Sequence, residues 1–317
     1  MNSQPSSLSR RQFLASAGFA AVAISVVPRR LFAADESPVT IIRQAAATAR
    51  ITVTKLRGNI SVLEGSGGNV AVLTGADGKV LVDAGITASR PRITEALAGL
   101  NADPVKHLIN THWHFDHTDG NEWLHSVGAK ITAQENTRKH LSVDTRVEGW
   151  NFTFVASPPG ALPTDVFASE KKLHLNGETI ALKYYPPAHT DSDISVEFPK
   201  ANVLHVGDTW WNGYYPFIDY STGGSINGAI HAAEVNVARV TNETIVIPGH
   251  GPIGDKAGLI AFRDMLVDVR DKVSALKKQG KSVTEVVAAA PTAAYDAKWG
   301  GFVIDGKTFT ALVYAGV

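Results

Sequence analysis

The sequence predicts an α/β fold in which one sandwich is built from two similar layers. The 317 residues are 44% hydrophobic and 19% charged, which supplies enough apolar side chains for a large core. Two β-rich stretches, around residues 51–82 and 171–207, are each followed by helix and strand patterns in alternation. No repeat of solenoid period and no linker-like change of composition separates the halves. We therefore expect both halves to belong to one domain.

Apolar runs bounded by turn residues define the elements of the first half. Asp77-Gly78 lies between two such runs and predicts a tight hairpin, whereas the glycines within residues 65–68 predict a break between strands. Pro91 suits the first turn of a helix. Strands are expected at residues 51–54, 60–63, 70–73, 80–82, 105–109 and 130–132. Helices are expected at residues 91–100, 122–127 and 135–141.

The second half repeats this order after an interruption. Residues 144–170 carry scattered aromatic residues and prolines, which predicts a long irregular insert that serves as a functional loop or lid. Strand patterns return between residues 171 and 207, with a hairpin expected at Asn176-Gly177. A further strand is expected at residues 244–247, and helices are expected at residues 226–240, 256–279 and 283–290.

Residues 1–34 have the features of an export signal. Arg10 and Arg11 form a twin-arginine pattern, and residues 15–27 follow as an apolar run rich in Ala and Gly. A run of this length is too short to span a bilayer as a permanent helix. The pattern predicts passage through the twin-arginine translocase, a periplasmic or secreted mature protein, and no stable membrane insertion.

Two runs of small residues are candidates for the cleavage site of this signal. Cleavage near Ala34 is preferred and leaves residues 35–317 as a single mature domain, while a run at residues 45–49 is the later alternative. Because twin-arginine export moves folded proteins, it suits an enzyme that acquires a metal ion before it leaves the cytoplasm.

Charge and cysteine content exclude several classes of function. The chain has 30 basic and 30 acidic residues; four of the basic ones lie within residues 1–34, which leaves 26 against 30 and a formal charge of −4. No basic face is expected, which argues against nucleic acid as a partner. The chain has no cysteine, so a metal site must be built from His, Asp and Glu.

One short motif concentrates metal-binding side chains directly after the strand pattern at residues 105–109. His112 and His114 are two residues apart, so they point to the same side of an extended segment. Asp116 and His117 follow where the chain turns, and they can converge on a second point. Imidazole and carboxylate are ligands of Zn²⁺ and of similar borderline metals. The motif therefore predicts a site for one or two metal ions.

Three further candidates lie at similar junctions downstream. His189, Asp208 and His250 each follow an apolar run and lie beside a Gly or Pro, as expected for a site on the edge of a sheet. The remaining histidines are expected to have ordinary structural roles, and they are His107, His125, His140, His174, His205 and His231.

Together these residues resemble the five-part signature of the metallo-β-lactamase superfamily, in order from about residue 51 to about residue 255. Asp83 matches the family's first motif, an aspartate at a strand end that supports the ligands from outside. The resemblance implies a four-layer αββα sandwich and a metal-dependent hydrolase with two metal ions, zinc above all, although the donors also suit Fe or Mn. It assigns His112, His114 and His189 to one ion, Asp116, His117 and His250 to the other, and Asp208 to both.

The resemblance also implies a reaction. A hydroxide held between the two metal ions would attack the carbonyl of a small ester, lactone, thioester or amide, and Asp116 would orient that nucleophile and relay its proton. β-Lactam hydrolysis is compatible with this site but not favoured. The commonest β-lactamases of the family place a cysteine where this chain has Asp208, and a bridging Asp is shared instead by glyoxalase II-like and lactonase-like hydrolases.

The aromatic residues near the motifs allow two interpretations. Some of them could wall a pocket for a moderately apolar small-molecule substrate, or they could be ordinary core. The pocket candidates are Trp113, Phe115, Trp210, Trp211 and Tyr214. Two alternatives to the hydrolase also stand: an enzyme resembling persulfide dioxygenases that holds a single iron, and an accessory periplasmic protein of a quinoprotein system.

Overall fold

Two β-sheets pack face to face, and helices cover the outer face of each sheet. The computed structural model describes residues 37–317, so the predicted signal and its preferred cleavage position lie outside the described residues. The first sheet has seven strands in the order β1-β2-β3-β4-β5-β6-β9, and the second has five in the order β10-β11-β12-β13-β14. A separate hairpin is formed by β7 (Thr145–Val147) and β8 (Phe152–Phe154).

The bounds of the remaining elements are as follows. The first sheet contains β1 (Thr52–Lys55), β2 (Ile60–Glu64), β3 (Val70–Leu73), β4 (Lys79–Val82), β5 (Val105–Ile109), β6 (Lys130–Gln134) and β9 (Asp165–Phe167). The second contains β10 (Glu170–Leu175), β11 (Glu178–Tyr184), β12 (Ile194–Phe198), β13 (Val203–His205) and β14 (Ile245–Ile247). The helices are α2 (Pro38–Ala46), α3 (Arg90–Leu100), α4 (Phe115–Thr118), α5 (Asn121–Ser126), α6 (Glu135–Leu141), α7 (Ile226–Arg239), α8 (Lys256–Lys278), α9 (Val283–Ala288), α10 (Asp296–Trp299) and α11 (Gly306–Gly316).

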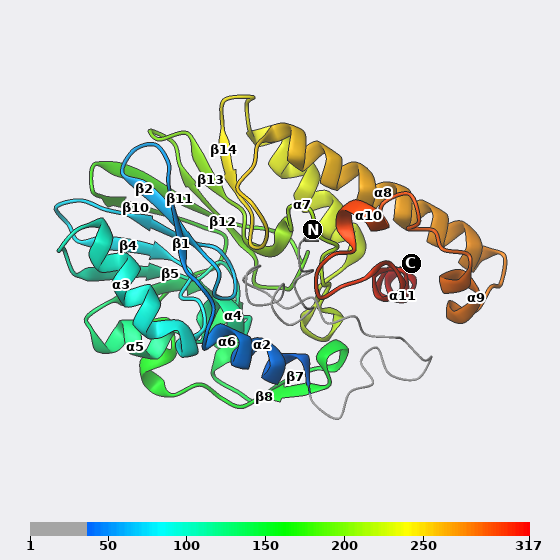
Figure 1. Cartoon of the computed structure of the whole chain (residues 1–317), viewed down its shortest axis with the longest axis horizontal. Helices are drawn as coiled ribbons and strands as arrows, with labels where there is room; N and C mark the ends of the chain where they lie inside the picture. The colour runs from blue at the N-terminus through cyan, green and yellow to red at the C-terminus, as the bar shows by residue number, and fades with distance from the viewer. Residues whose placement is uncertain (1–36) are drawn as a thin grey trace, which may run out of the picture.

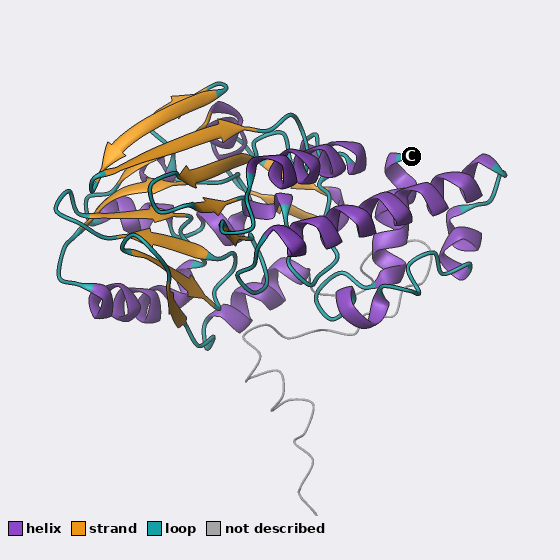
Figure 2. Ribbon diagram, turned by 90° about the horizontal axis from the view of Figure 1, so that it is seen from above, coloured by secondary structure: helices purple, strands orange, loops and turns teal. Residues whose placement is uncertain are grey.

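The alternation of side chains along the strands produces the layers. In β4, Val80 and Val82 face the second sheet and join the core between the sheets, whereas Leu81 faces outward into the core beneath α3 and α5. On the other side of the molecule, Leu204 and Val246 point outward into the core under α7 and α8. Figures 1 and 2 show the resulting helix–sheet–sheet–helix order, which confirms the predicted four-layer αββα sandwich.

Both predicted hairpins form, but only the second has a two-residue turn, because residues 74–78 all lie in the loop of the first. β3 pairs antiparallel with β4 across the Asp77-Gly78 turn, and β10 pairs antiparallel with β11 across Asn176-Gly177. Asn176 and Gly177 both have positive φ, at 54° and 72°, which is the left-handed backbone that a two-residue hairpin turn requires.

The structure corrects the sequence analysis in several places. The insert at residues 144–170 is not irregular throughout, because it contains the β7–β8 hairpin and β9, which pairs with β6 at the edge of the first sheet. His112 and His114 lie in the loop between β5 and α4 and not on an extended strand. Helices α2, α10 and α11 were not predicted. The described residues therefore contain additional helices, one near their start and two near their end, that the hydrophobic patterns did not indicate.

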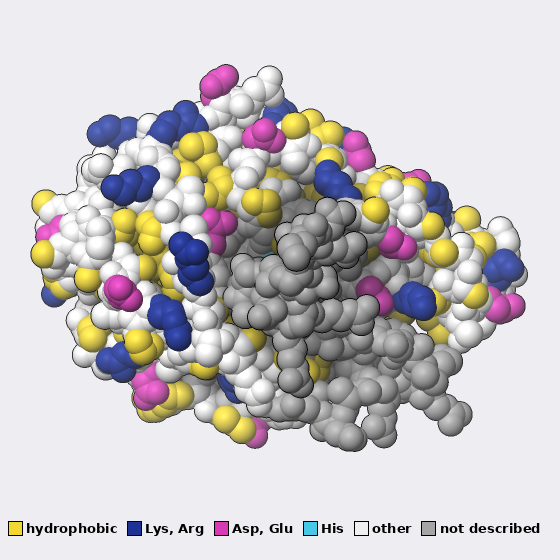
Figure 3. Space-filling view, viewed as in Figure 1, with side chains coloured by type: hydrophobic (Ala, Val, Ile, Leu, Met, Phe, Trp, Pro, Cys, Tyr) yellow, Lys and Arg dark blue, Asp and Glu magenta, His cyan; other side chains and the backbone are white. Residues whose placement is uncertain are grey.

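The helices and one face of the surface can be described for residues 37–317. Within this range, no helix combines the length and the apolar character needed to cross a bilayer. On the described part of the face in Figure 3, Lys and Arg side chains are interspersed with Asp and Glu.

Candidate metal centre

The loops that follow β5, β11, β13 and β14 bring the predicted ligands to one edge of the sandwich. His112 and His114 follow β5, and Asp116 and His117 lie on the short helix α4. Three more candidates come from the second sheet, namely His189 between β11 and β12, Asp208 in the 3-10 turn after β13, and His250 directly after β14. Strand ends at a common edge aim short loops at a common point, which explains how distant segments converge.

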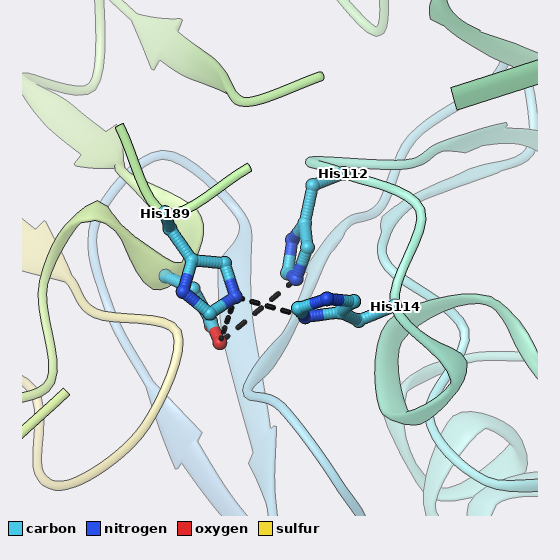
Figure 4. Close-up of side chains that lie close together, drawn as sticks. His112, His114 and His189 are labelled. Carbon is cyan, nitrogen blue, oxygen red and sulfur yellow. Dashed lines mark hydrogen bonds and ion pairs between the residues drawn. The ribbon is translucent and has the colours of Figure 1, made fainter. Parts of the chain in front are cut away.

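Three histidines and one carboxylate form the first cluster. The ligand atoms of His112, His114, His189 and Asp208 all lie within 4.8 Å of one another, and all four side chains are buried. His189 Nε2 lies 2.9 Å from His114 Nδ1 and 3.3 Å from Asp208 Oδ2. Figure 4 shows the three imidazole rings pointing toward one another.

Asp116, His117 and His250 form the second cluster. His250 Nε2 lies 3.2 Å from Asp116 Oδ2, and His117 Nε2 lies 3.6 Å from the same oxygen. Asp208 touches this cluster as well, because its Oδ1 lies 3.1 Å from His117 Nε2 and its Oδ2 lies 3.3 Å from His250 Nε2. The carboxylate of Asp208 is therefore placed between the two clusters.

The outer nitrogen of two ligand rings has a partner that fixes its proton. His114 Nε2 lies 3.0 Å from the carboxylate of Asp219, and His189 Nδ1 lies 2.8 Å from the carbonyl oxygen of Phe217. Since both partners only accept hydrogen bonds, the proton of each neutral ring is on the outer nitrogen. The inner nitrogens, His114 Nδ1 and His189 Nε2, then face each other with lone pairs at 2.9 Å. Only a cation or an additional proton satisfies both.

Asp83 fixes His117 in the same way. Its Oδ2 lies 2.7 Å from His117 Nδ1 and accepts a hydrogen bond from Thr111 Oγ1, while its Oδ1 accepts one from the Thr111 amide. Asp83 is fully buried and has a φ of 68°, a strained backbone for a residue other than glycine. The sequence analysis predicted this supporting position for Asp83. It did not identify Asp219, which supports His114 from a loop that no strand pattern precedes.

Three buried atoms in the clusters form no hydrogen bond of normal geometry among the described residues, namely His112 Nε2, His117 Nε2 and Asp208 Oδ1, although the last two lie 3.1 Å apart. Burying unpartnered nitrogen and carboxylate atoms is unfavourable unless a further group satisfies them. All three are atoms of the kind that bind Zn²⁺ and related ions as ligands, and they point into the two clusters. The residues present therefore fit two metal ions.

Two glycines allow the backbone to approach these side chains. A Cβ at Gly68 would overlap the ring of His117, and one at Gly249 would overlap Oδ1 of Asp208. The glycine-rich loop at residues 65–68 thus packs directly against the metal-binding residues. Larger side chains at either position would displace a candidate ligand.

The carboxylates control the protonation of the second cluster. Burial disfavours charge on His250, but the nearby carboxylates of Asp208 and Asp116 outweigh it and raise the pKa of His250 to about 9. His117 behaves alike, since burial is outweighed by Asp208, Asp116 and Asp83, and its pKa is raised well above the usual range. In the first cluster, burial dominates and lowers the pKa of His112 well below its usual value. Without metal ions, protons on the second cluster balance the carboxylates.

The metal-free protein is expected to lose stability as the pH rises from 6.5, the usual pKa of histidine, to about 9, the pKa of His250 in the folded protein. When the pKa of a group is higher in the folded state than in the unfolded state, binding of its proton stabilises the protein. This stabilisation is complete below the unfolded-state pKa and is lost as the pH rises through the folded-state pKa. The loss should be on the order of 3 kcal/mol. Denaturant unfolding of chelator-treated protein at several pH values measures it, and His250→Gln should reduce the dependence. Constant or rising stability over this range would contradict the charge arrangement.

A mainly apolar cavity opens above the metal-binding residues. Asp116, Asp208 and His250 lie at its base, and the walls include Phe115, Trp150 and Trp211. Of the aromatic residues predicted to line a pocket, Phe115 and Trp211 therefore do so.

The other three aromatic candidates do not line this cavity. Trp113 and Trp210 are almost fully buried in the hydrophobic core, and Trp113 Nε1 donates a hydrogen bond to Thr222 Oγ1. Tyr214 does not line the cavity itself but packs its ring on the lining residue Phe302, with 4.7 Å between the ring centroids. Trp113 and Trp210 thus fit the alternative interpretation as core residues, and the half-buried Tyr214 lies outside the cavity lining.

Trp150 is the wall residue that the sequence analysis did not single out as a pocket candidate. It belongs to the insert at residues 144–170, and its ring centroid lies 5.0 Å from that of His114 and 4.9 Å from that of Phe217. Through Trp150, which lies between β7 and β8, the insert therefore contributes to the lining of the cavity.

Comparisons with known proteins show which protein family and which relatives the chain matches. A protein-family model described as "Metallo-beta-lactamase superfamily" matches residues 63–254. The chain is 23% identical over 147 residues to metallo-beta-lactamase IND-1 of Chryseobacterium indologenes, which covers 46% of this chain and 56% of that protein. It is 30% identical over 106 residues to a hydroxyacylglutathione hydrolase of Erythrobacter litoralis, which covers 33% of this chain and 34% of that protein.

These matches are partial, and the structural likeness extends further. The chain spans between about a third and somewhat over half of the lengths of the two curated relatives. Among solved structures, the stereoselective inverting sec-alkylsulfatase Pisa1 from Pseudomonas sp. superposes with a TM-score of 0.63 at 15% identity. That superposition covers 86% of this chain and 51% of the sulfatase. At this level of identity the likeness shows a shared fold.

Proposed function

Because the chain belongs to the metallo-β-lactamase superfamily, we propose that it is an exported hydrolase that uses two zinc ions. Its twin-arginine signal directs the folded protein to the periplasm or beyond, and residues 35–317 form the mature domain. The substrate is a small ester, lactone, thioester or amide. The ligands are His112, His114 and His189 for one ion, Asp116, His117 and His250 for the other, and Asp208 for both.

The opposed ring nitrogens of His114 and His189 carry the metal part of this proposal. Their lone pairs face each other at 2.9 Å because Asp219 and the Phe217 carbonyl hold the ring protons on the far side. A metal ion between them satisfies both nitrogens at once. The position of Asp208 between the clusters supports a second ion that shares this carboxylate.

The chain's own residues supply the rest of the chemistry. Bound zinc ions would lower the pKa of a water and polarise a carbonyl oxygen of the substrate. Asp116 lines the cavity beside His250, so its carboxylate can orient that water and accept its proton. Phe115, Trp150 and Trp211 exclude bulk water from the reacting groups and provide apolar contact.

The donor set favours general carbonyl hydrolysis over β-lactam hydrolysis. No cysteine is available for the second metal ion, and Asp208 occupies the position from which it contacts both clusters. The names of the two relatives refer to different substrates, a β-lactam and a hydroxyacyl thioester of glutathione. We therefore propose one type of reaction, the hydrolysis of a carbonyl compound, and leave the substrate as a class of small molecules.

The protein recovered from the periplasmic fraction is expected to contain two zinc ions per chain and to hydrolyse a carbonyl ester, lactone or thioester. Elemental analysis gives the metal content, and a parallel panel of nitrocefin, acyl-homoserine lactones, thioesters and phosphodiesters gives the activity. Chelator-treated protein is the control and should be inactive until zinc is restored.

Two other outcomes would replace this proposal. One iron per chain with oxygen consumption would identify an enzyme similar to persulfide dioxygenases. Two zinc ions without turnover of any panel member would favour an accessory role in a quinoprotein system.

A further inference from the structure

The roof of the cavity is built from two segments that lie outside the range matched by the family model. Pro38 and Ile42 come from helix α2, which precedes residues 63–254, and Phe302, Val303 and Ile304 come from the connection between α10 and α11, which follows them. We call these five residues the roof. They lie above Asp116, Asp208 and His250 in the same cavity.

Helix α2 is anchored at both ends, which holds its two roof residues, Pro38 and Ile42, in place. At its start, Ser37 Oγ donates a hydrogen bond to the carbonyl oxygen of Trp150 at 3.1 Å. At its end, Ser89 Oγ donates to the carbonyl oxygen of Ala46 at 2.7 Å. Val39 between them is fully buried. Figure 1 shows α2 beside the β7–β8 hairpin, which carries the neighbouring wall of the cavity.

The other half of the roof rests on the metal-binding residues themselves. The ring centroid of Phe302 lies 5.9 Å from that of His250 and 5.8 Å from that of Trp211. Val303 and Ile304 follow it along the cavity. A substrate bound at His250 therefore also contacts the apolar side chains of Phe302, Val303 and Ile304.

The cavity has no positive side chain among its described lining residues. Its ionisable residues are Asp116, Asp208 and His250, all of them candidate metal ligands, and the other lining residues are apolar. Arg43 is adjacent to Ile42 but is directed elsewhere, with its guanidinium 3.2 Å from Asp119 and 5.2 Å from the centroid of the Phe115 ring. A carboxylate on the substrate would thus lose its hydration without gaining a cationic partner from these residues.

We propose that the roof selects substrates by an uncharged, apolar group next to the scissile carbonyl, with Ile42 as a specificity-determining residue. This inference rests on the proposed hydrolase function and narrows its substrate class. It disfavours substrates that carry a carboxylate close to the reacting carbonyl. It also requires that α2 stay in the mature protein, which agrees with cleavage near Ala34 and not within residues 45–49.

The test compares the mature enzyme with Ile42→Ala on three p-nitrophenyl esters that differ in the length of the acyl chain, namely the butyrate, the hexanoate and the octanoate. Removing the Ile42 side chain should raise the ratio of kcat/KM for octanoate to that for butyrate about tenfold, because the added space accepts the longer chain. Ile41→Ala is the matched control, since it removes the same atoms from the same helix at a position that does not line the cavity. Ile42→Trp should shift the preference toward butyrate.

A binding experiment separates this inference from the proposed function. The affinities of hexanohydroxamate and of a hydroxamate of equal length ending in a carboxylate are measured by calorimetry on the zinc-loaded protein. The carboxylate should weaken binding at least about tenfold, as expected for a charge without a partner. Equal or tighter binding of the charged compound, or the same chain-length ratios in Ile42→Ala and wild type, would overturn the inference. If no ester is hydrolysed but the hydroxamates bind as expected, the proposed activity fails and the selective roof stands.

Discussion

Asp116→Asn is expected to keep most of the bound metal and to lose turnover by roughly 10²–10⁴-fold, the usual contribution of a general base. The amide has the shape of the carboxylate but cannot accept a proton. His117, His250 and Asp208 remain to hold the second ion. The measurement is kcat on an ester that wild type hydrolyses, together with the metal content of the same preparation.

Asp119→Asn is the matched control for this substitution. Asp119 lies three residues further along the chain, pairs with Arg43 and accepts a hydrogen bond from the Thr87 amide, outside both clusters. The same chemical change there should leave kcat nearly unchanged. Near-wild-type turnover in Asp116→Asn would remove the proton-transfer role from Asp116.

His189→Ala is expected to empty the first metal site and to leave one ion per chain. The substitution removes Nε2, which lies 2.9 Å from His114 Nδ1 and 3.3 Å from Asp208 Oδ2, so the first cluster loses a ligand from its centre. With fewer donors the affinity of that site falls, and hydrolysis should become undetectable because both ions are needed. Elemental analysis after gel filtration, and calorimetric titration of the metal-free variant with zinc, count the sites.

His231→Ala provides the control for the loss of a histidine. Its side chain is 57% exposed on α7, outside the two clusters, so the variant should bind two ions as wild type does. Two full-affinity sites in His189→Ala would show that His189 is not a ligand. Loss of both ions would show that the two sites depend on each other for binding.

The layers of the fold and the residues that form the clusters follow from the sequence because their signals are local. The alternation of Val80, Leu81 and Val82 gives the faces of a strand, and three histidines and one aspartate within residues 112–117 indicate a metal-binding segment. Each ligand also follows an apolar strand, so knowing where strands end is enough to expect convergence at one edge. Whether these residues bind zinc remains a prediction.

Features that depend on tertiary contacts could not be predicted in the same way. Helix α2 ends in an alanine run that is equally typical of a cleavage site, and only its packing against Trp150 and Ser89 distinguishes a structural helix. Asp219 has no strand before it, and its role is visible only when His114 lies 3.0 Å away. Trp113 and Trp211 are alike in sequence context and belong to the same buried cluster, but Trp211 lines the cavity and Trp113 does not.

The fixed ring protons of His114, His117 and His189 have a consequence for how the protein obtains its metal. Asp219, Asp83 and the Phe217 carbonyl aim the inner nitrogens before any ion arrives. Ions can therefore enter and leave a receptor that is already assembled, and one metal can replace another without refolding. Imidazole and carboxylate donors bind several divalent ions. The supply of metal ions in the compartment where the folded protein resides is then expected to decide which ion occupies the site.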